Sequence, residues 1–117
     1  MSRGATILVV DDEEMVRKLI LTMLRKEGYQ CLAAVNGLEA IAVFRSNASI
    51  VELVITDLRM PVMGGAEAVA RLRETRPDIP IICMSGYTEE TVPRGAQFLA
   101  KPFQRAKLLA AVKRVLP

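Results

Sequence analysis

Short apolar runs alternate with longer amphipathic segments along the whole chain. The runs at 7–10, 53–56 and 80–84 are rich in β-branched residues, a composition typical of strands that are buried on both faces. Residues 29–34 and 97–100 have weaker strand patterns, and the first of these is polar enough for a sheet edge. Because helical segments separate the runs, the pattern predicts an α/β fold, a parallel sheet with helices on both faces.

Four helices are predicted, at residues 14–27, 37–45, 66–74 and 104–116. Three of them carry apolar side chains at helical spacing, and these should turn toward the sheet. The side chains are Val16, Leu19, Ile20, Met23 and Leu24 in the first helix, Leu38, Ile41, Ala42 and Phe44 in the second, and Leu108, Leu109, Val112 and Val115 in the last. Gly28 suits the end of the first helix, so the helix boundaries are marked as well as the helix faces.

The composition indicates one folded domain over residues 1–117, with its core at about 6–116. A chain of 117 residues can bury a core without disulfides, and 51% apolar with 25% charged residues excludes a disordered chain. No apolar stretch approaches the ~20 residues of a membrane span, and the first residues lack the apolar core of a signal peptide. We therefore expect a cytoplasmic protein that does not enter a membrane by itself.

The basic balance of the chain, a net charge of +3, does not indicate a nucleic-acid-binding protein. The cations alternate with apolar residues at helical spacing, and no segment remains for a recognition helix. Cys31 and Cys83 lie in strand patterns, so we expect buried free thiols. With no histidine and no C-x-x-C spacing, a zinc site and histidine-based catalysis have little support.

Three carboxylates follow two of the predicted strands. Asp11 and Asp12 come directly after the first run, and Asp57 follows the run at 53–56. Each alone is typical of a turn or a helix cap. If the two strands are neighbours, however, the acids converge at the carboxyl edge of the sheet, where like charges require a cation. Oxygen ligands of this kind suit Mg²⁺, which also binds phosphate oxygens.

A hydroxyl and an ammonium group follow the remaining strands. Ser85 directly follows the run at 80–84, and Lys101 directly follows the run at 97–100. Taken alone, Ser85 is typical of a turn and Lys101 of a solvated surface. Together with the acids, they supply a hydrogen-bond donor and a positive charge for a phosphoryl group on Asp57.

Four segments in this order resemble the response-regulator receiver domain of two-component signalling. They are ILVVDDEE, VITDLRMPVMGG, IICMSGYTEE and FLAKPF, and the resemblance covers about residues 6–116. SGYTEE and FLAKPF are most similar to receivers of hybrid histidine kinases. The resemblance implies a doubly wound, flavodoxin-like three-layer sandwich with five parallel strands in the order 2-1-3-4-5.

The resemblance also implies a metal site and a phosphoryl donor. Asp57 is then the phosphoacceptor, and Mg²⁺, or Mn²⁺ in its place, binds Asp12, Asp57 and the backbone carbonyl of Arg59. Asp11 holds the ion through water. The phosphoryl group comes from a cognate histidine kinase or histidine phosphotransfer domain, because this chain has no histidine. The chain is expected as a monomer or weak dimer.

The other implied roles belong to the remaining strand ends. Lys101 pairs with Asp57 and later with the phosphoryl oxygens, while backbone N–H groups near Leu58 and Gly86 complete the cradle. Ser85 and Phe98 form the conformational switch. The Lys101–Pro102 peptide bond is expected to be cis.

Two features depart from the family pattern. Gly64-Gly65 stands where Asp-Gly is commoner, and only 86–100 separates Ser85 from Lys101, so the fourth helix must be shortened. Because of Pro93 and Gly95, we expect a loop or single turn at 88–95.

Arg59 and Tyr87 flank the route of an attacking water, which suggests slow hydrolysis of the phosphoaspartate, unless both side chains point into solvent.

Two other functions stay open. A Mg²⁺-dependent phosphatase with an aspartate nucleophile has a related chemistry, but it places two aspartates one residue apart. A degenerate receiver would act only as a protein-interaction module, yet it should have lost Asp57, Lys101 or an acid of the pair. The chain is either a single-domain regulator or the receiver of a longer protein.

Overall fold

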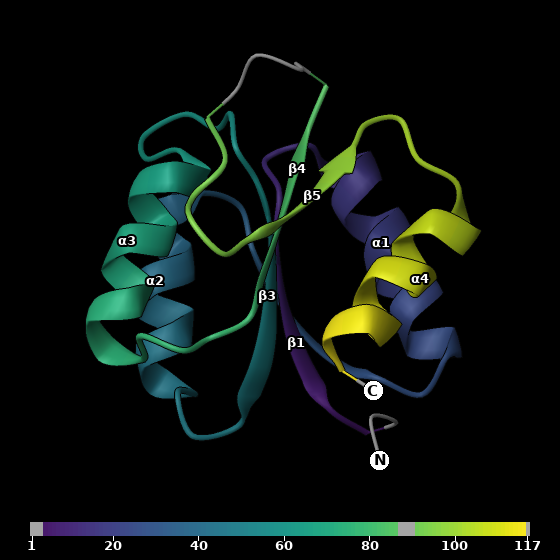
Figure 1. Ribbon diagram of the computed structural model, residues 1–117, viewed down its shortest axis with the longest axis horizontal. Coiled ribbons are helices and arrows are strands. Elements are labelled where there is room, and N and C mark those ends of the chain that lie inside the picture. Colours follow the sequence, from purple (N-terminus) through teal and green to yellow (C-terminus); the bar gives the residue numbers. More distant parts are fainter. Residues whose placement is uncertain (1–3, 87–90, 117) are drawn as a thin grey trace.

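Five parallel strands form one sheet at the centre of the molecule (Figure 1). The computed structural model describes residues 4–86 and 91–116. The strands are β1 (Thr6–Val10), β2 (Gln30–Ala34), β3 (Val51–Asp57), β4 (Ile81–Ser85) and β5 (Gln97–Ala100). Their order in the sheet is β2-β1-β3-β4-β5, so the predicted doubly wound order is confirmed, with the polar β2 at one edge.

Four helices cover the two faces of the sheet, as Figure 1 shows. One face carries α1 (Glu14–Lys26) and α4 (Arg105–Val115), and the other carries α2 (Gly37–Ser46) and α3 (Gly65–Thr75). Each of their boundaries agrees with the predicted one to within one residue. The start of β1 and the end of α4 lie at the same end of the molecule, opposite the carboxyl ends of the strands.

Side chains of the central strands alternate between two apolar cores. On β1, Ile7 and Val9 pack toward α1 and α4, while Leu8 and Val10 pack toward α2 and α3. All four are fully buried. The unbroken apolar runs of the sequence therefore reflect a sheet that is covered on both faces, which fixes where each strand ends and where its polar residue emerges.

Three side chains predicted to turn inward are exposed. Leu19 is 54% and Leu38 56% exposed, and Ala42 is exposed as well. In each helix the buried positions follow a narrower stripe, Ile20, Leu21 and Leu24 in α1 and Gly37, Ala40, Ile41 and Phe44 in α2. A helix rotates by about 100° per residue, so a neighbour of a buried position can leave the stripe.

The connection between β4 and β5 contains no helix in its described residues 91–96. These residues form a turn in which Ala96 N–H donates to the Pro93 carbonyl at 3.1 Å, within the usual range for such bonds. Gly95 has φ +79°, the left-handed conformation that favours glycine. The predicted loop is confirmed for residues 91–95, whereas Thr88 and the rest of 87–90 lie outside the described residues.

None of the helices within residues 4–86 and 91–116 is long and apolar enough to cross a membrane. The longest of them, α1, has 13 residues. A helix that spans a bilayer needs about 20.

Both cysteines are free, but only Cys83 is buried, and Cys31 is partly exposed. Burial raises the pKa of the Cys83 thiol to about 11, although the charge of Arg73 opposes the shift. Burial also raises the pKa of Cys31, with Arg25 opposing. Since the thiolate is the reactive species, the two thiols should differ strongly in reactivity.

We predict that a thiol reagent at neutral pH modifies Cys31 of the folded protein and spares Cys83. The rates should differ by at least about a hundredfold, because Cys83 has both a smaller thiolate fraction and no access to the reagent. Peptide mapping after timed alkylation measures the two rates. In denaturant both cysteines should react alike, and equal rates in the folded protein would contradict the assigned burial.

Candidate functional site

The three aspartates predicted at the strand ends converge at the carboxyl edge of the sheet. β1 and β3 are neighbours in register, with Val10 opposite Thr56, so the acids that follow them lie side by side. Carboxylate oxygens of Asp11, Asp12 and Asp57 all lie within 4.8 Å of one another. Asp11 and Asp57 are buried, whereas Asp12 is exposed.

Lys101 reaches this cluster from the end of β5. Its Nζ donates to Asp11 Oδ2 at 2.9 Å and to Asp57 Oδ2 at 3.0 Å. The Lys101 backbone N–H donates to the Ser85 carbonyl at 2.8 Å, and the Lys101–Pro102 peptide bond is cis, as predicted. The side chain is 15% exposed, so one ammonium group binds two buried carboxylates.

The pKa values of the central pair reflect burial and mutual attraction. Burial raises the pKa of the Asp57 carboxyl and outweighs its hydrogen bond and charge interaction with Lys101, which lower the pKa. Burial alone would lower the pKa of Lys101, but hydrogen bonds and charges from Asp11 and Asp57 raise it. Lys101 is therefore protonated at neutral pH.

A hollow of about 290 Å³ opens above Asp57. It is lined by Asp12, Glu13, Asp57, Arg59, Gly86 and Lys101. The space gives a small phosphoryl-sized group access to the Asp57 carboxylate with Lys101 beside it. Arg59 lines this hollow and is exposed, while Tyr87 lies outside the described residues, so the hydrolysis hypothesis stays a prediction.

The two predicted switch residues lie apart. Ser85 is the last residue of β4 and is buried. Phe98 is 41% exposed and lies on β5 opposite Cys83, on the face of the sheet that α2 and α3 cover. The structure thus brings Ser85 to the carboxyl edge of the sheet. It places Phe98 two residues before the end of β5, on the face that α2 and α3 cover.

The loop from β3 to α3 passes directly behind Asp57. Gly65 N–H donates to the Leu58 carbonyl at 3.0 Å, and a Cβ on Gly65 would overlap the Asp57 carbonyl oxygen and lie 3.0 Å from Leu58 Cα. Only glycine fits this close approach. Gly64 precedes α3 as its N-cap without a side-chain cap, so the departure from Asp-Gly removes a cap and leaves the carboxylates in place.

One backbone contact differs from the expected cradle. The N–H of Leu58 donates to the Met84 carbonyl at 2.9 Å and is therefore used within the fold. The N–H of Arg59 instead hydrogen-bonds the Asp57 carboxylate. The expected N–H group near Leu58 is therefore that of Arg59, because the Leu58 N–H itself is used in pairing with β4.

Comparison with known proteins identifies the family. A family model described as the response regulator receiver domain matches residues 7–113. The chain belongs to this family. It is a receiver domain of two-component signalling, as the four motifs indicated.

Relatives carry this receiver in different settings. The chain is 36% identical to the sensor kinase CckA of Brucella abortus over 99% of its own length, but it spans only 13% of that protein. It is also 36% identical to the sporulation initiation phosphotransferase F of Bacillus subtilis, and this match covers 95% of the chain and 93% of the relative.

Solved receivers have the same fold. One is the receiver domain of the sensor histidine kinase PA1611 from Pseudomonas aeruginosa, solved with a magnesium ion in its active-site cleft. The similarity has a TM-score of 0.85 and 26% sequence identity, and it covers 97% of this chain and 98% of the other.

The donor set of this receiver fits a hard divalent cation. Asp11, Asp12 and Asp57 bring three negative charges, while Lys101, in contact with two of them, brings one positive charge. The excess negative charge and the carboxylate oxygens are what Mg²⁺ requires. The exposed Asp12, which lines the hollow, is open to an incoming ion.

Sequence reasoning missed two partners of Lys101. Asp11 accepts one of its hydrogen bonds, and Glu13 Oε1 lies 3.6 Å from its Nζ. Asp11 also accepts from the Glu13 N–H at 2.9 Å, and Arg17 donates to the Asp11 carbonyl at 2.9 Å. The acidic run after the first strand indicates that carboxylates lie near Lys101, but it does not show which of them the lysine binds.

Proposed function

We propose that this receiver accepts a phosphoryl group on Asp57 from the phosphohistidine of a cognate histidine kinase or histidine phosphotransfer domain. The observation that carries the proposal is the pairing of Asp57 with Lys101 Nζ at 3.0 Å, beside the hollow above the carboxylate. Glycine behind Asp57 and the bonds of Asp11 fix this pair in place.

The transfer exchanges one phosphorus bond for another. An Asp57 carboxylate oxygen attacks phosphorus, the phosphorus–nitrogen bond to the donor histidine breaks, and the partner keeps its imidazole. Lys101 balances charge on the phosphoryl oxygens in line with its present role between two carboxylates. The Ser85 hydroxyl, at the end of β4, donates to another phosphoryl oxygen.

Mg²⁺ is the proposed cofactor, and Mn²⁺ is its proposed substitute. Asp12, Asp57 and the backbone carbonyl of Arg59 would hold the ion, and Asp11 would hold it through water. When bound, the ion neutralises charge on the phosphoryl oxygens during transfer. The magnesium-bound PA1611 receiver supports this assignment, as does the excess negative charge of the aspartate cluster.

Ser85 and Phe98 are the proposed switch. Once Ser85 binds the phosphoryl group, the loop after β4 is drawn toward Asp57, and the ring of Phe98, which is 41% exposed, turns inward. Such a switch shifts the balance between two states of the domain.

Incubation with Mg²⁺ and acetyl phosphate, followed by intact-mass measurement, tests the proposal. A receiver gains the mass of one phosphoryl group, and peptide mapping places it on Asp57. Turnover of acetyl phosphate without an adduct would indicate a phosphatase instead. The absence of both an adduct and turnover would indicate that the domain acts only as a protein-interaction module.

Millimolar Mg²⁺ should raise the melting temperature, and the rise should be smaller for Asp12→Ala. The ion binds the folded state only, because the unfolded chain does not hold the three carboxylates together. Differential scanning fluorimetry with and without Mg²⁺ measures both shifts. Asp78→Ala, an exposed aspartate in the turn after α3, is the matched control and should respond like the wild type. Equal responses of the Asp12 and Asp78 variants would remove Asp12 from the ligand set.

The partner that donates the phosphoryl group should dock beside α1. An apolar hollow of about 560 Å³ next to Lys101 is lined by Val16, Leu19, Ile20, Gly86, Lys101, Pro102 and Phe103. Leu19 and Met15 are exposed on α1 itself, 54% and 86% respectively. An apolar surface beside the phosphoacceptor suits a partner helix.

Leu19→Asp should slow phosphoryl transfer from a protein donor by about tenfold, because it charges the centre of this apolar surface. Transfer from acetyl phosphate should not change. Ile50→Asp is the control, since Ile50 is similarly exposed just before β3, at the other end of the sheet. Phosphotransfer rates with both donors measure the effect. Equal slowing with both donors would show that Leu19 affects the transfer step and not the docking of the partner.

The remaining proposals concern context. We propose that residues 1–117 form one receiver domain with its core at about 6–116, that it acts in the cytoplasm, and that it exists as a monomer or weak dimer. Two free thiols suit a reducing compartment. Its own phosphorylation and dephosphorylation are the only reactions we propose that it assists.

A further inference from the structure

Strand β2 forms an open edge of the sheet. In the part of the chain that the structure describes, residues 4–86 and 91–116, β2 pairs with β1 alone. Asp11 N–H donates to the Ala34 carbonyl at 3.2 Å, so in a parallel ladder Ala34 and Leu32 both turn their backbone groups toward β1. Those of Cys31 and Ala33 therefore face outward, where another strand can pair with them.

The free part of this edge is short and symmetric. The outward-facing N–H group before it, that of Tyr29, donates to the Leu24 carbonyl at 3.2 Å. The outward-facing N–H group after it, that of Val35, donates to Glu39 Oε1 at 2.9 Å. Both ends of the edge are thus closed by the chain itself, and the free residues lie on either side of Leu32.

A second copy of β2 that runs antiparallel matches this edge. With a two-fold axis at Leu32, Cys31 of each copy lies opposite Ala33 of the other, and each such pair exchanges hydrogen bonds in both directions. The Leu32 residues of the two copies form the close, non-hydrogen-bonded pair between them, on the face that α2 covers. The outward N–H groups of both edges then all have partners.

The helices beside β2 are acidic at one end and basic at the other. α1 has Glu14 in its first turn and Arg25 and Lys26 in its last, and α2 has Glu39 in its first turn and Arg45 in its last. Because each helix connects parallel strands, both run antiparallel to β2, with their acidic ends at its carboxyl end. Antiparallel pairing of two β2 strands therefore places acidic ends beside basic ends.

One side of α2 is uncovered next to this edge. Leu38, Ala42 and Arg45 follow one another at helical spacing and are all exposed. Val43, on another side of the helix, packs partly buried in the core that α2 shares with α3. Since α2 contacts α3 and β2, the uncovered side faces the open edge of β2.

α2 and β2 lie alongside each other over nearly equal lengths. α2 has 10 residues and β2 has 5, which correspond to about 15 and about 17 Å. A two-fold axis at Leu32 therefore passes near Ala42, at the middle of α2. Glu39 and Arg45 lie equally far on either side of Ala42, so each meets its opposite charge on the other copy.

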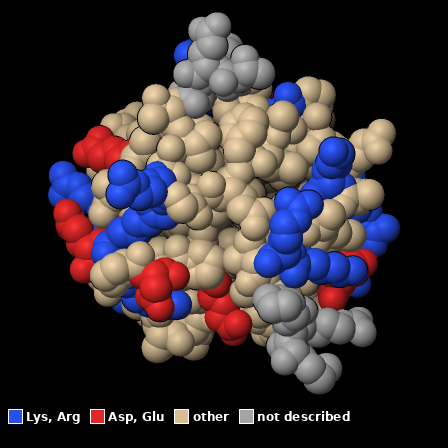
Figure 2. Space-filling view, viewed as in Figure 1, with Lys and Arg blue, Asp and Glu red and all other residues tan. Residues whose placement is uncertain are grey.

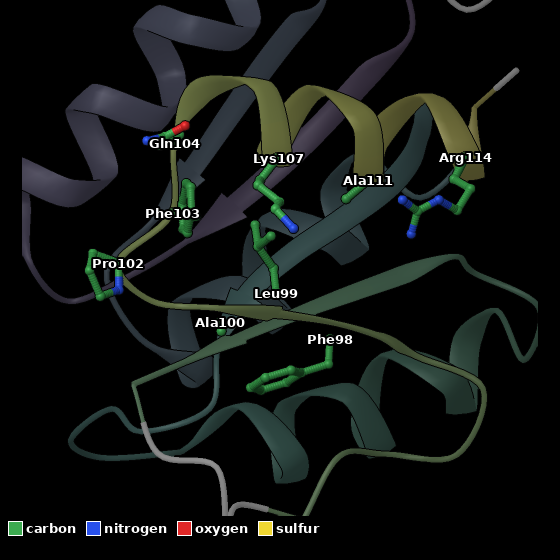
Figure 3. A pocket seen from close by; sticks show the side chains of 9 residues that line it. All are labelled: Phe98, Leu99, Ala100, Pro102, Phe103, Gln104, Lys107, Ala111 and Arg114. Atoms are coloured by element: carbon green, nitrogen blue, oxygen red, sulfur yellow. The ribbon is translucent and has the colours of Figure 1, made fainter.

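β5, at the other end of the strand order, lacks this match. Helix α4 beside it has no acid in its first turn, and it has Lys113 and Arg114 in its last. Lys107 and Arg114 reach toward β5 in Figure 3, and Figure 2 shows Lys and Arg side chains gathered over α4. Two copies joined along β5 would bring cations against cations, so self-pairing is favoured at β2.

We propose that two copies of the receiver associate through β2, antiparallel about Leu32, and form one continuous sheet with 5 strands from each copy. Leu32 and Leu38 of both copies form the apolar centre of the interface, and Glu39 of each copy binds Arg45 of the other. This is the interface of the weak dimer proposed above, and it forms without phosphorylation.

Both phosphoacceptor sites stay accessible in this dimer. Because the strands of the two copies run in opposite directions, the hollows above Asp57 lie at opposite ends of the joined sheet. Leu19 lines the apolar hollow between α1 and Phe103, on the side of α1 away from β2. Each copy can therefore receive a phosphoryl group independently of the other.

Sedimentation equilibrium over a concentration series tests the proposal with the unphosphorylated protein. The average mass should rise from one chain toward two. Where about nine in ten chains are paired, amide exchange at Cys31 and Ala33 should be about tenfold slower than in dilute protein. Leu32, whose amide faces β1, should not change. A chain still monomeric at about 1 mM would overturn the proposal, and labelling of Asp57 by acetyl phosphate remains a separate result.

A lysine on the edge should prevent the pairing. Ala33→Lys should weaken association at least about tenfold, because it places like charges on both paired edges. Ala33 is exposed, so the monomer should stay folded. Ala70→Lys adds the same charge at an exposed position of α3 and should associate like the wild type. Equal association of the two variants would overturn the assignment to β2.

Charge reversal tests the paired side chains. Glu39→Lys and Arg45→Glu should each weaken self-association about tenfold, because like charges then meet at the interface. An equal mixture of the two variants should form mixed dimers close to the wild-type affinity, since every contact again joins opposite charges. Circular dichroism checks that each variant is folded. A mixture no stronger than its components would overturn the pairing of Glu39 with Arg45.

A disulfide tests the register. Leu32→Cys in a Cys31→Ser background should cross-link two chains in oxidised glutathione, because the two residues meet at the axis with Cα atoms about 4.5 Å apart. Ile50→Cys in the same background is the exposed control and should not cross-link. Equal yields would indicate random collision and contradict the register. A chain that stays monomeric but pairs through β2 with an added strand peptide would overturn the proposal in favour of another protein as partner.

Discussion

Replacing Asp57 by asparagine should abolish phosphorylation completely. Asparagine has nearly the same shape, but its amide oxygen is not the anionic nucleophile that attacks phosphorus. The domain should stay folded, because the change also removes the repulsion between Asp57 and Asp11. Intact-mass measurement after incubation with acetyl phosphate and Mg²⁺ should show one adduct on the wild type and none on the variant.

Asp78→Asn provides the matched control for this experiment. Asp78 is exposed in the turn between α3 and the start of β4 and does not follow the carboxyl end of a strand, and the substitution is chemically identical. Its adduct should form at the wild-type rate. An adduct of undiminished yield on the Asp57 variant would show that another side chain accepts the phosphoryl group.

Replacing Lys101 by methionine should cost about 3 kcal/mol of unfolding free energy in the absence of divalent ions. Methionine keeps most of the apolar stem but removes the only cation in contact with the buried carboxylates of Asp11 and Asp57 among the described residues. Breaking a buried ion pair on one side leaves uncompensated charge. Urea denaturation measures the loss.

Lys18→Met is the control, since Lys18 forms an ion pair with Glu14 at 3.1 Å on the exposed face of α1. Its loss should be below about 1 kcal/mol because exposed pairs contribute little. A cost for Lys101→Met no larger than that of Lys18→Met would contradict the structural role of the buried pair.

The Lys101→Met deficit should grow with pH and shrink with Mg²⁺. Burial already raises the pKa of Asp57, and Lys101 is the main group that opposes this shift, so its removal raises the pKa further. A raised pKa means that the folded state holds the proton longer than the unfolded chain, and stability falls as pH rises. We therefore expect a smaller deficit at about pH 5 than at about pH 8, and Mg²⁺ should restore part of the loss by replacing the missing charge.

Most of the fold was predictable because it depends on local patterns. The apolar run of β1 with Asp11 and Asp12 at its end specifies a buried strand and a polar edge. This prediction does not depend on where the helices are expected to begin and end. Leu38 shows where the pattern fails: its apolar side chain belongs to α2 but faces solvent, because helix rotation relative to the sheet is set by packing.

The site was predictable as a set of residues and less so as a set of contacts. Convergence of Asp12, Asp57 and Lys101 follows once β1, β3 and β5 are placed in one parallel sheet. The bond between Lys101 and Asp11 depends on side-chain geometry across 90 residues of sequence, and the need for Gly65 depends on a close approach to the Asp57 carbonyl. Neither leaves a periodic signal in the sequence.

The start of β1 and the end of α4 share the end of the molecule that is farthest from Asp57, and this sets the reach of any tethered donor. The longest extent of the molecule is 31 Å. A flexible linker has an r.m.s. end-to-end distance of about 5–6 Å times the square root of its length, so a linker of about 30 residues matches that distance on average. A linker of about this length would give the donor's own receiver the highest effective concentration, whereas a linker too short to span the distance would favour transfer to a receiver on another molecule.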